Sequence, residues 1–115
     1  MSSVNRVLLS GNMTADPSLN HTNNGTPVVN FRIASNRKAG DKVKTCFIDC
    51  AAFGAQAESV MKYCHKGSSV LVEAQLDEDQ WTADSGEKRF KHYLTAQQVH
   101  ILSWEESAKA DDVDI

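Results

Sequence analysis

Residues 45–53, TCFIDCAAF, carry the clearest strand pattern in the chain. Every second residue of this stretch is small or apolar, namely Cys46, Ile48, Cys50 and Ala52. The residues between them are Phe47, Asp49, Ala51 and Phe53. Because successive side chains of a strand point to opposite faces, we expect the first set to face the interior of a β-barrel. The two phenylalanines then project outward.

A single helix is expected directly after this strand. The apolar residues that recur at helical spacing are Ala57, Val60, Met61 and Cys64. Gly67 follows them, where the glycine that ends a helix is common. The pattern therefore predicts one short helix in an otherwise β-rich chain.

Four further strands are expected around this strand–helix unit. Residues 4–10 are β-prone and are ended by Gly11 and Asn12, and residues 12–25 form a strand extension and a loop. Residues 28–35 alternate, with Val29, Phe31 and Ile33 on one face. Residues 37–42 form a basic loop, and strands at 70–76 and 90–102 flank a turn at 84–86. An all-β, five-stranded barrel with one helix between strands 3 and 4 is the OB-fold order, which commonly binds oligonucleotides or oligosaccharides.

The charge of the chain is unevenly distributed. At 115 residues and 41% apolar content, one compact domain is expected. The net charge is −3, yet residues 103–115 alone carry five acids and one lysine, which leaves residues 1–102 at +1. We therefore expect a domain at 1–104 and a short acidic C-terminal tail at 105–115 with a separate role.

The remaining composition argues against several classes of protein. No apolar run is long enough for a membrane span and the N-terminus lacks a signal-peptide core, so a cytoplasmic protein is expected. Cys46, Cys50 and Cys64 lack the spacing of common zinc modules, and small core residues are the favoured interpretation over a metal site. No catalytic motif is present, so neither an enzyme nor a cofactor is predicted.

Several segments follow one family pattern in the same order along the chain. They are VNRVLLSGNM (4–13) with DP (16–17), FIDC (47–50) with FG (53–54), YCHKGSSV (63–70), EAQL (73–76) and WTADSG (81–86). Together, over about residues 4–102, they resemble bacterial single-stranded DNA-binding proteins. The resemblance implies binding of single-stranded DNA without sequence specificity, in replication, recombination and repair. It also implies assembly from four identical chains, with a dimer as the second choice.

The resemblance assigns base stacking to Phe47, Phe53 and Trp81. Non-specific binding of single strands requires such aromatic platforms, because every base has a π-face. A strand phenylalanine is more often a core residue, but here the opposite face of residues 45–53 already supplies the interior. Phe90 and Trp104 are interpreted as packing residues.

Phosphate contacts are expected from the basic residues Arg6, Arg32, Lys66, Lys88 and Arg89. Lys91 and the cations at 37, 38, 42 and 44 are further candidates, and a solvated surface cation is the alternative for any of them. The chain departs from the family pattern at Arg37 and Lys38, where an aromatic platform is common, and at Ala55, where a lysine is common. Acids at 49 and 77–79 are a further departure. These changes predict weaker or more salt-sensitive binding than in a typical member of the family, or a different path of the DNA strand.

The acidic tail offers a candidate partner-binding segment in Asp111, Asp112, Asp114 and Ile115. Relatives end in an acidic, apolar tip that docks replication and repair proteins, but this chain lacks the Pro-Phe ending. A solubilising, disordered terminus is the alternative. A third interpretation is that the tail lies over a basic groove and competes with DNA.

Two other functions remain open. The first is an OB-fold primosome or replisome accessory protein that acts mainly through protein contacts. The second is RNA binding through the same face, because stacking does not distinguish the sugars. Trp81 and the tail favour single-stranded DNA, whereas the acidic substitutions favour the accessory role.

Overall fold

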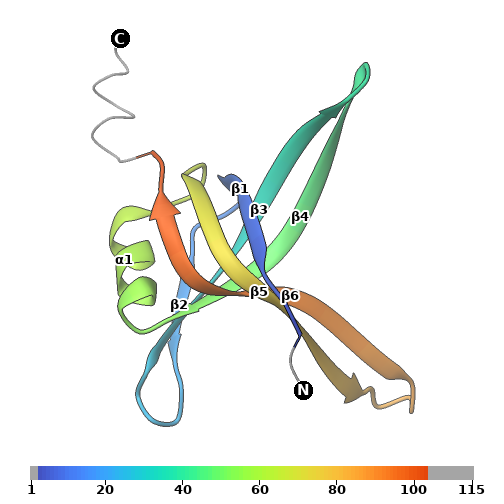
Figure 1. Ribbon diagram of the computed structural model, residues 1–115. Helices are drawn as coiled ribbons and strands as arrows, with labels where there is room; N and C mark the ends of the chain where they lie inside the picture. The colour runs from blue at the N-terminus through green and yellow to red at the C-terminus, as the bar shows by residue number, and fades with distance from the viewer. Residues whose placement is uncertain (1–2, 104–115) are drawn as a thin grey trace.

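The computed structural model describes residues 3–103 and consists mostly of strands (Figure 1). The elements are β1 (Val7–Met13), β2 (Ser18–His21), β3 (Pro27–Ala39), β4 (Lys42–Phe53), α1 (Ala55–Tyr63), β5 (Ser69–Thr82) and β6 (Lys88–Ile101). β1 pairs antiparallel with both β3 and β5, β3 pairs with β4, and β5 pairs with β6. A parallel pairing of β4 with β6 closes the ring. The predicted five-stranded barrel is therefore confirmed, formed by β1, β3, β4, β6 and β5.

The position of the helix was predicted incorrectly, because residues 18–21 form a strand of their own. β2 pairs with β3 at residues 27–30, while β1 pairs with the same strand at residues 33–34. β1 and β2 thus follow one line along β3, interrupted at residues 14–17. Pro17 lacks the backbone N–H that a continuous ladder requires. The helix consequently lies between the fourth and fifth strands, not between the third and fourth.

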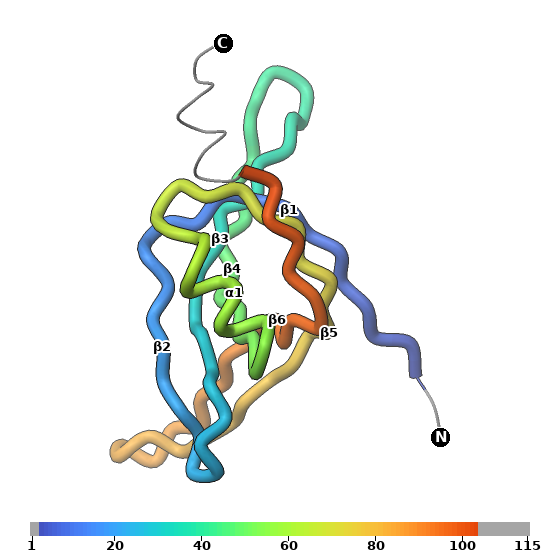
Figure 2. Tube along the Cα trace, turned by 90° about the vertical axis from the view of Figure 1, so that its left-hand side faces the viewer, coloured from blue at the N-terminus to red at the C-terminus, as the bar shows by residue number. Residues whose placement is uncertain are grey.

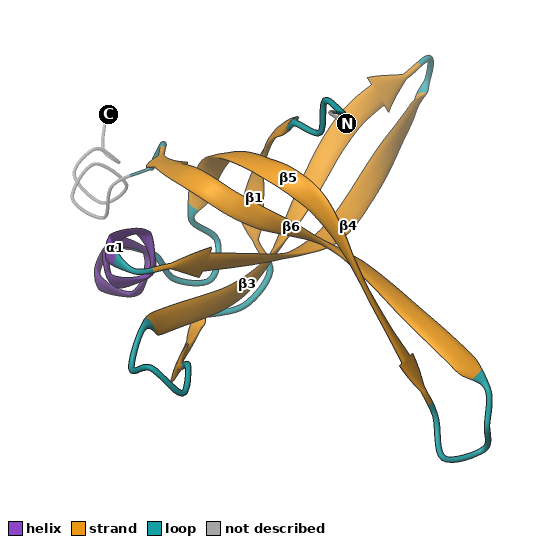
Figure 3. Cartoon of the chain, turned by 60° about the horizontal axis from the view of Figure 1, so that its bottom comes forward, coloured by secondary structure: helices purple, strands orange, loops and turns teal. Residues whose placement is uncertain are grey.

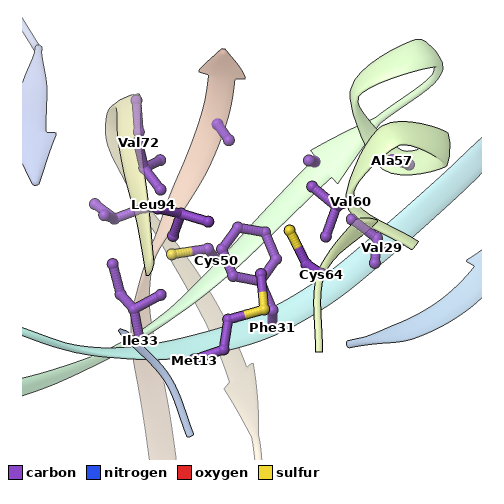
Figure 4. Packing of buried hydrophobic residues seen from close by; sticks show 14 residues of the cluster. Met13, Val29, Phe31, Ile33, Cys50, Ala57, Val60, Cys64, Val72 and Leu94 are labelled. Carbon is purple, nitrogen blue, oxygen red and sulfur yellow. The ribbon is translucent and has the colours of Figure 1, made fainter. Parts of the chain in front are cut away.

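The core fills the barrel and extends to the helix (Figure 4). Val29, Phe31 and Ile33 of β3 share one face, as predicted, and this face points inward. Cys50 and Ala52 of β4, predicted to face the interior, join them. From α1, Ala57 and Val60 are fully buried, so the helix covers one end of the barrel (Figure 2). Two expected core residues are not buried, since Cys46 is exposed and Met61 is 36% exposed. Cys46 lies where β4 has left the barrel, and Met61 lies on the outer side of the helix.

Two long hairpins leave the barrel on the side opposite α1 (Figures 1 and 3). In the first, β3 and β4 pair as far as Ala39 and Lys42, so the predicted basic loop at 37–42 is mostly strand. Gly40, with φ +66°, allows the tight turn. In the second, β5 and β6 pair as far as Thr82 and Lys88. These two hairpins extend the sheet beyond the barrel on that side.

β1 passes very close to β3 where the barrel closes. A Cβ built on Gly11 would lie 2.5 Å from the carbonyl oxygen of Ala34, so only glycine fits there. The strand therefore continues through Gly11 to Met13 rather than ending at Gly11 as expected.

Within residues 3–103, no helix is long and apolar enough to cross a membrane.

Candidate nucleic-acid interface

One continuous outer face runs across β3, β4, β6 and β5. Strand pairing places Arg32 beside Asp49 and Ala34 beside Phe47, all facing outward. On the second hairpin, the same alternation places Tyr93 opposite Asp77, Lys91 opposite Asp79, and Arg89 opposite Trp81. An ion pair between Lys91 of β6 and Asp49 of β4 joins the two halves. We call this surface the outer face.

Exposed aromatic rings lie along the outer face. Phe47, Phe53 and Trp81 are 53%, 45% and 50% exposed, so the structure places all three predicted stacking residues on it. About half of each side chain stays in water, which forgoes roughly 1 kcal/mol of burial energy per ring. Tyr93, half-buried on β6, is a fourth ring that the sequence analysis missed. Its alternation with Arg89 and Lys91 along the fifth barrel strand was the signal that could have identified it.

Cations on the outer face are held by a central carboxylate. Asp49 accepts from Arg32 Nη1 at 3.4 Å through Oδ1 and from Lys91 Nζ at 2.9 Å through Oδ2. The Arg32 guanidinium also lies 5.5 Å from the centroid of the Phe47 ring. Pairs this exposed contribute at most about 1 kcal/mol each, so a phosphate can displace the carboxylate at modest cost. Asp49 therefore limits how much positive charge this surface presents.

The aromatic and charged residues surround a hollow of about 270 Å³ in the middle of the outer face. Its rim includes Phe53 and Tyr93, and Ala51 lies in its floor. The Tyr93 hydroxyl donates to Asp79 Oδ1 at 3.3 Å. Desolvation, and then the charge of Asp79, raise the pKa of the Tyr93 phenol above its ordinary value. The phenol thus remains a hydrogen-bond donor at neutral pH.

The other predicted basic residues lie in different places. Arg89 stands opposite Trp81 and pairs with Glu87 at 3.0 Å. Lys88 lies near the tip of the same hairpin, where it and Trp81 line a hollow of about 230 Å³. Lys66 lies in the turn after α1, where its backbone N–H donates to Asp16 Oδ1. Arg6 precedes β1, so neither Arg6 nor Lys66 belongs to the four strands of the outer face.

Cysteine chemistry lies apart from the outer face. Cys50 and Cys64 are buried in the core, and only Cys46 is an exposed thiol. Desolvation, followed by the charge of Asp49, raises the pKa of Cys50 to about 12. Among residues 3–103, no group of three or more His, Cys, Asp or Glu side chains is arranged to hold a metal ion.

Phe90, expected to pack, is 61% exposed because the hairpin that carries it extends beyond the barrel.

Three of the predicted features lie outside the described residues. Trp104, the boundary at residue 104 and the tail residues Asp111, Asp112, Asp114 and Ile115 all belong to this part of the chain. Their roles stay predictions.

Comparison with known proteins identifies one family. Residues 4–102 match the model of the single-strand binding protein family. A single-stranded DNA-binding protein of Wolinella succinogenes is 39% identical over 105 residues, which cover 85% of this chain and 64% of the relative. A Helicobacter hepaticus protein of the same name is 36% identical, with 85% of this chain and 61% of the relative covered.

The chain therefore spans less than two thirds of the length of these two relatives. Coverage is fuller for single-stranded DNA-binding protein 2 of Chlorobaculum tepidum, which is 35% identical over 118 residues, with 97% of this chain and 80% of the relative covered. The barrel topology, the match to the family model over residues 4–102 and the identities to these relatives all indicate the same family. The chain belongs to the single-strand binding protein family.

Proposed function

We propose that this protein binds single-stranded DNA without overall sequence specificity and performs no catalysis. Bases stack on Phe47, Phe53 and Trp81, and phosphates contact Arg32 and Arg89. The observation that carries the proposal is the gathering of exposed rings and cations on one outer face of the barrel. Stacking tolerates any base, and each stacked base contributes about 1–3 kcal/mol. The names of the relatives support the same ligand.

Lys88 belongs to the proposed phosphate track because it lies at the hollow beside Trp81. Arg6 and Lys66 lie off the outer face. They contact phosphates only if the bound DNA strand continues around the barrel. The cellular role we propose is protection of exposed strands in replication, recombination and repair, in the cytoplasm at the nucleoid. Residues 105–115 are proposed to bind replication and repair proteins.

A homotetramer is the proposed assembly, with a dimer as the second choice. Support comes from exposed apolar side chains away from the outer face, among them Leu8 of β1, which is 65% exposed. One barrel also offers only a short track, so several barrels are needed for a long strand. Light scattering of the free protein gives the mass directly.

Tryptophan fluorescence tests the proposed ligand. The chain has two tryptophans, so a Trp104→Phe variant reports on Trp81 alone. Titration with oligo-dT should quench this signal, and the affinity should fall steeply as salt rises. Equal affinity for oligo-rU and oligo-dU would extend the function to RNA. No binding to any single strand would overturn the proposal and favour the accessory role through protein contacts.

A further inference from the structure

The hollow in the outer face has the shape and lining of a subsite for one nucleobase. Its floor is low because Ala51 has a small side chain between Asp49 and Phe53, two larger residues on the same face of β4. Its volume of about 270 Å³ is adequate for a single base. Phe53 from β4 and Tyr93 from β6 both line it, so a base that enters it can contact an aromatic ring from either strand.

The polar groups at the hollow are two carboxylates, the hydroxyl of Tyr93, the side-chain amide of Asn30, which can both donate and accept, and one cation. Asp49 and Asp79 both line it, and Lys91 is the one cation that does so. Lys91 is already engaged by Asp49 Oδ2 at 2.9 Å. The hydroxyl of Tyr93 already donates its hydrogen bond to Asp79 Oδ1. Among residues 3–103, the second oxygen of Asp79, Oδ2, accepts no hydrogen bond, so it is available to a ligand.

A free carboxylate oxygen discriminates between the edges of different bases. Carboxylates accept hydrogen bonds from the exocyclic amine of cytosine. Thymine and uracil present a carbonyl oxygen at the same position, which repels a carboxylate, and the N3 proton is the one donor that they offer beside it. The amine of adenine can donate in the same way as that of cytosine.

We propose that the hollow between Phe53 and Tyr93 is a base subsite in which Asp79 favours bases that carry an exocyclic amine over thymine and uracil. The proposal rests on the proposed function and refines it. Binding along the rest of the outer face stays tolerant of sequence, and Asp79 adds a preference at one position.

Oligo-dC and oligo-dU of equal length provide the test, because the two bases differ only at position 4 and at the N3 proton. Competition binding at pH 8 keeps cytosine neutral. The wild-type protein should prefer oligo-dC by about threefold to tenfold, as expected for a partly exposed hydrogen bond to a charged group. In Asp79→Asn the side-chain amide can donate to the carbonyl of uracil, so the preference should vanish or invert.

Glu78→Gln is the matched control. It removes one carboxylate from the neighbouring position of β5, on the opposite face, where Glu78 pairs with His92. Glu78→Gln should keep the wild-type ratio of the two affinities. Tyr93→Phe should increase the ratio, since Asp79 Oδ1 is then released and can also accept from the base.

Two results would overturn the base subsite while leaving the proposed function intact. One is equal wild-type affinity for the two strands, and the other is an unchanged ratio in Asp79→Asn. Failure of the wild-type protein to bind either strand would instead overturn the proposed function, and the subsite with it.

Discussion

Asp49 occupies the centre of the outer face and couples three strands. Its two oxygens hold Arg32 of β3 and Lys91 of β6, and its own side chain is 34% exposed. Salt bridges this exposed add little to stability, so their main effect is on charge. While the two cations are paired with Asp49, a phosphate must compete for them. This arrangement gives a physical basis for the weaker binding expected from the sequence.

Replacing Asp49 with asparagine should therefore strengthen binding to oligo-dT at low salt. Arg32 and Lys91 then meet phosphates without a competing carboxylate, and the slope of log K against log[salt] should become steeper by about 1. Asp77→Asn is the control, because Asp77 lies on the same face but bonds only the uncharged Thr95 and Gln75. Similar gains in both variants would show that only net charge matters and would contradict the competition.

The thiol of Cys50 makes stability depend on alkaline pH. Its pKa is raised from 9.0 to about 12 in the folded protein, so the unfolded chain loses this proton first. The free energy of unfolding should therefore fall as pH rises above 9, by up to about 1.4 kcal/mol per pH unit from this group. That loss should continue towards pH 12, whereas below pH 9 the contribution is fully present.

Urea unfolding from pH 8 to 10.5 measures this slope. Cys50→Ala should have a shallower pH dependence than the wild type, although its stability at pH 8 is lower. Cys46→Ala removes an exposed thiol and should retain the wild-type slope. Parallel curves for Cys50→Ala and the wild type would exclude Cys50 as the source.

At the scale of the elements, alternation predicted the faces of the strands well wherever a core was present. Val29, Phe31 and Ile33 are buried and Arg32 is exposed, as expected. The same reasoning failed at Cys46, which is exposed because it lies on a hairpin beyond the barrel. There the alternation continues but no core lies beneath it. Residues 37–42 are mostly polar, so their sequence resembles that of a loop although they include the paired ends of two strands. This explains why a loop was predicted there.

The candidate site was predictable in its composition but not in its shape. Phe47 and Phe53 share a strand, so their common face follows from alternation alone. Tyr93 reaches the same surface only through the parallel pairing of β4 with β6, which joins residues far apart in sequence. The hollow depends on that pairing as well as on Ala51, so local patterns could not show it.

Gly11 tests the close crossing of β1 over β3. Gly11→Ala should lower the free energy of unfolding by about 1–3 kcal/mol, since the added methyl group meets the backbone of Ala34. Ser10→Ala, at the exposed neighbouring position, should change stability by less than about 0.5 kcal/mol. Denaturant unfolding compares the two, and a Gly11→Ala variant as stable as Ser10→Ala would contradict the crossing.

At the scale of the whole molecule, charge is divided between the barrel and the end of the chain. Residues 1–102 carry +1 overall, and residues 103–115 carry five acids against one lysine. The net charge of −3 therefore conceals a barrel that presents cations beside its exposed rings. The four strands that carry the outer face, β3, β4, β5 and β6, all belong to the closed ring. The barrel alone therefore positions this face.

Removal of residues 105–115 tests whether the acidic end competes with DNA. If these residues lie over the basic parts of the barrel, the shortened protein should bind oligo-dT more tightly at low salt. The gain should disappear at high salt, where charges are screened. Unchanged affinity at low salt would reject competition and leave partner binding or solubility as the role of the segment.

The most direct measurement compares two exposed aromatic residues of one hairpin. Trp81 lies on the outer face opposite Arg89, whereas Phe90 pairs with Gln80 and points to the other side. Trp81→Ala should lose about 1–3 kcal/mol of binding free energy for oligo-dT, and Phe90→Ala should lose little. Both variants should retain the fold by circular dichroism. Equal losses in the two variants, or full affinity in Trp81→Ala, would contradict stacking on the outer face.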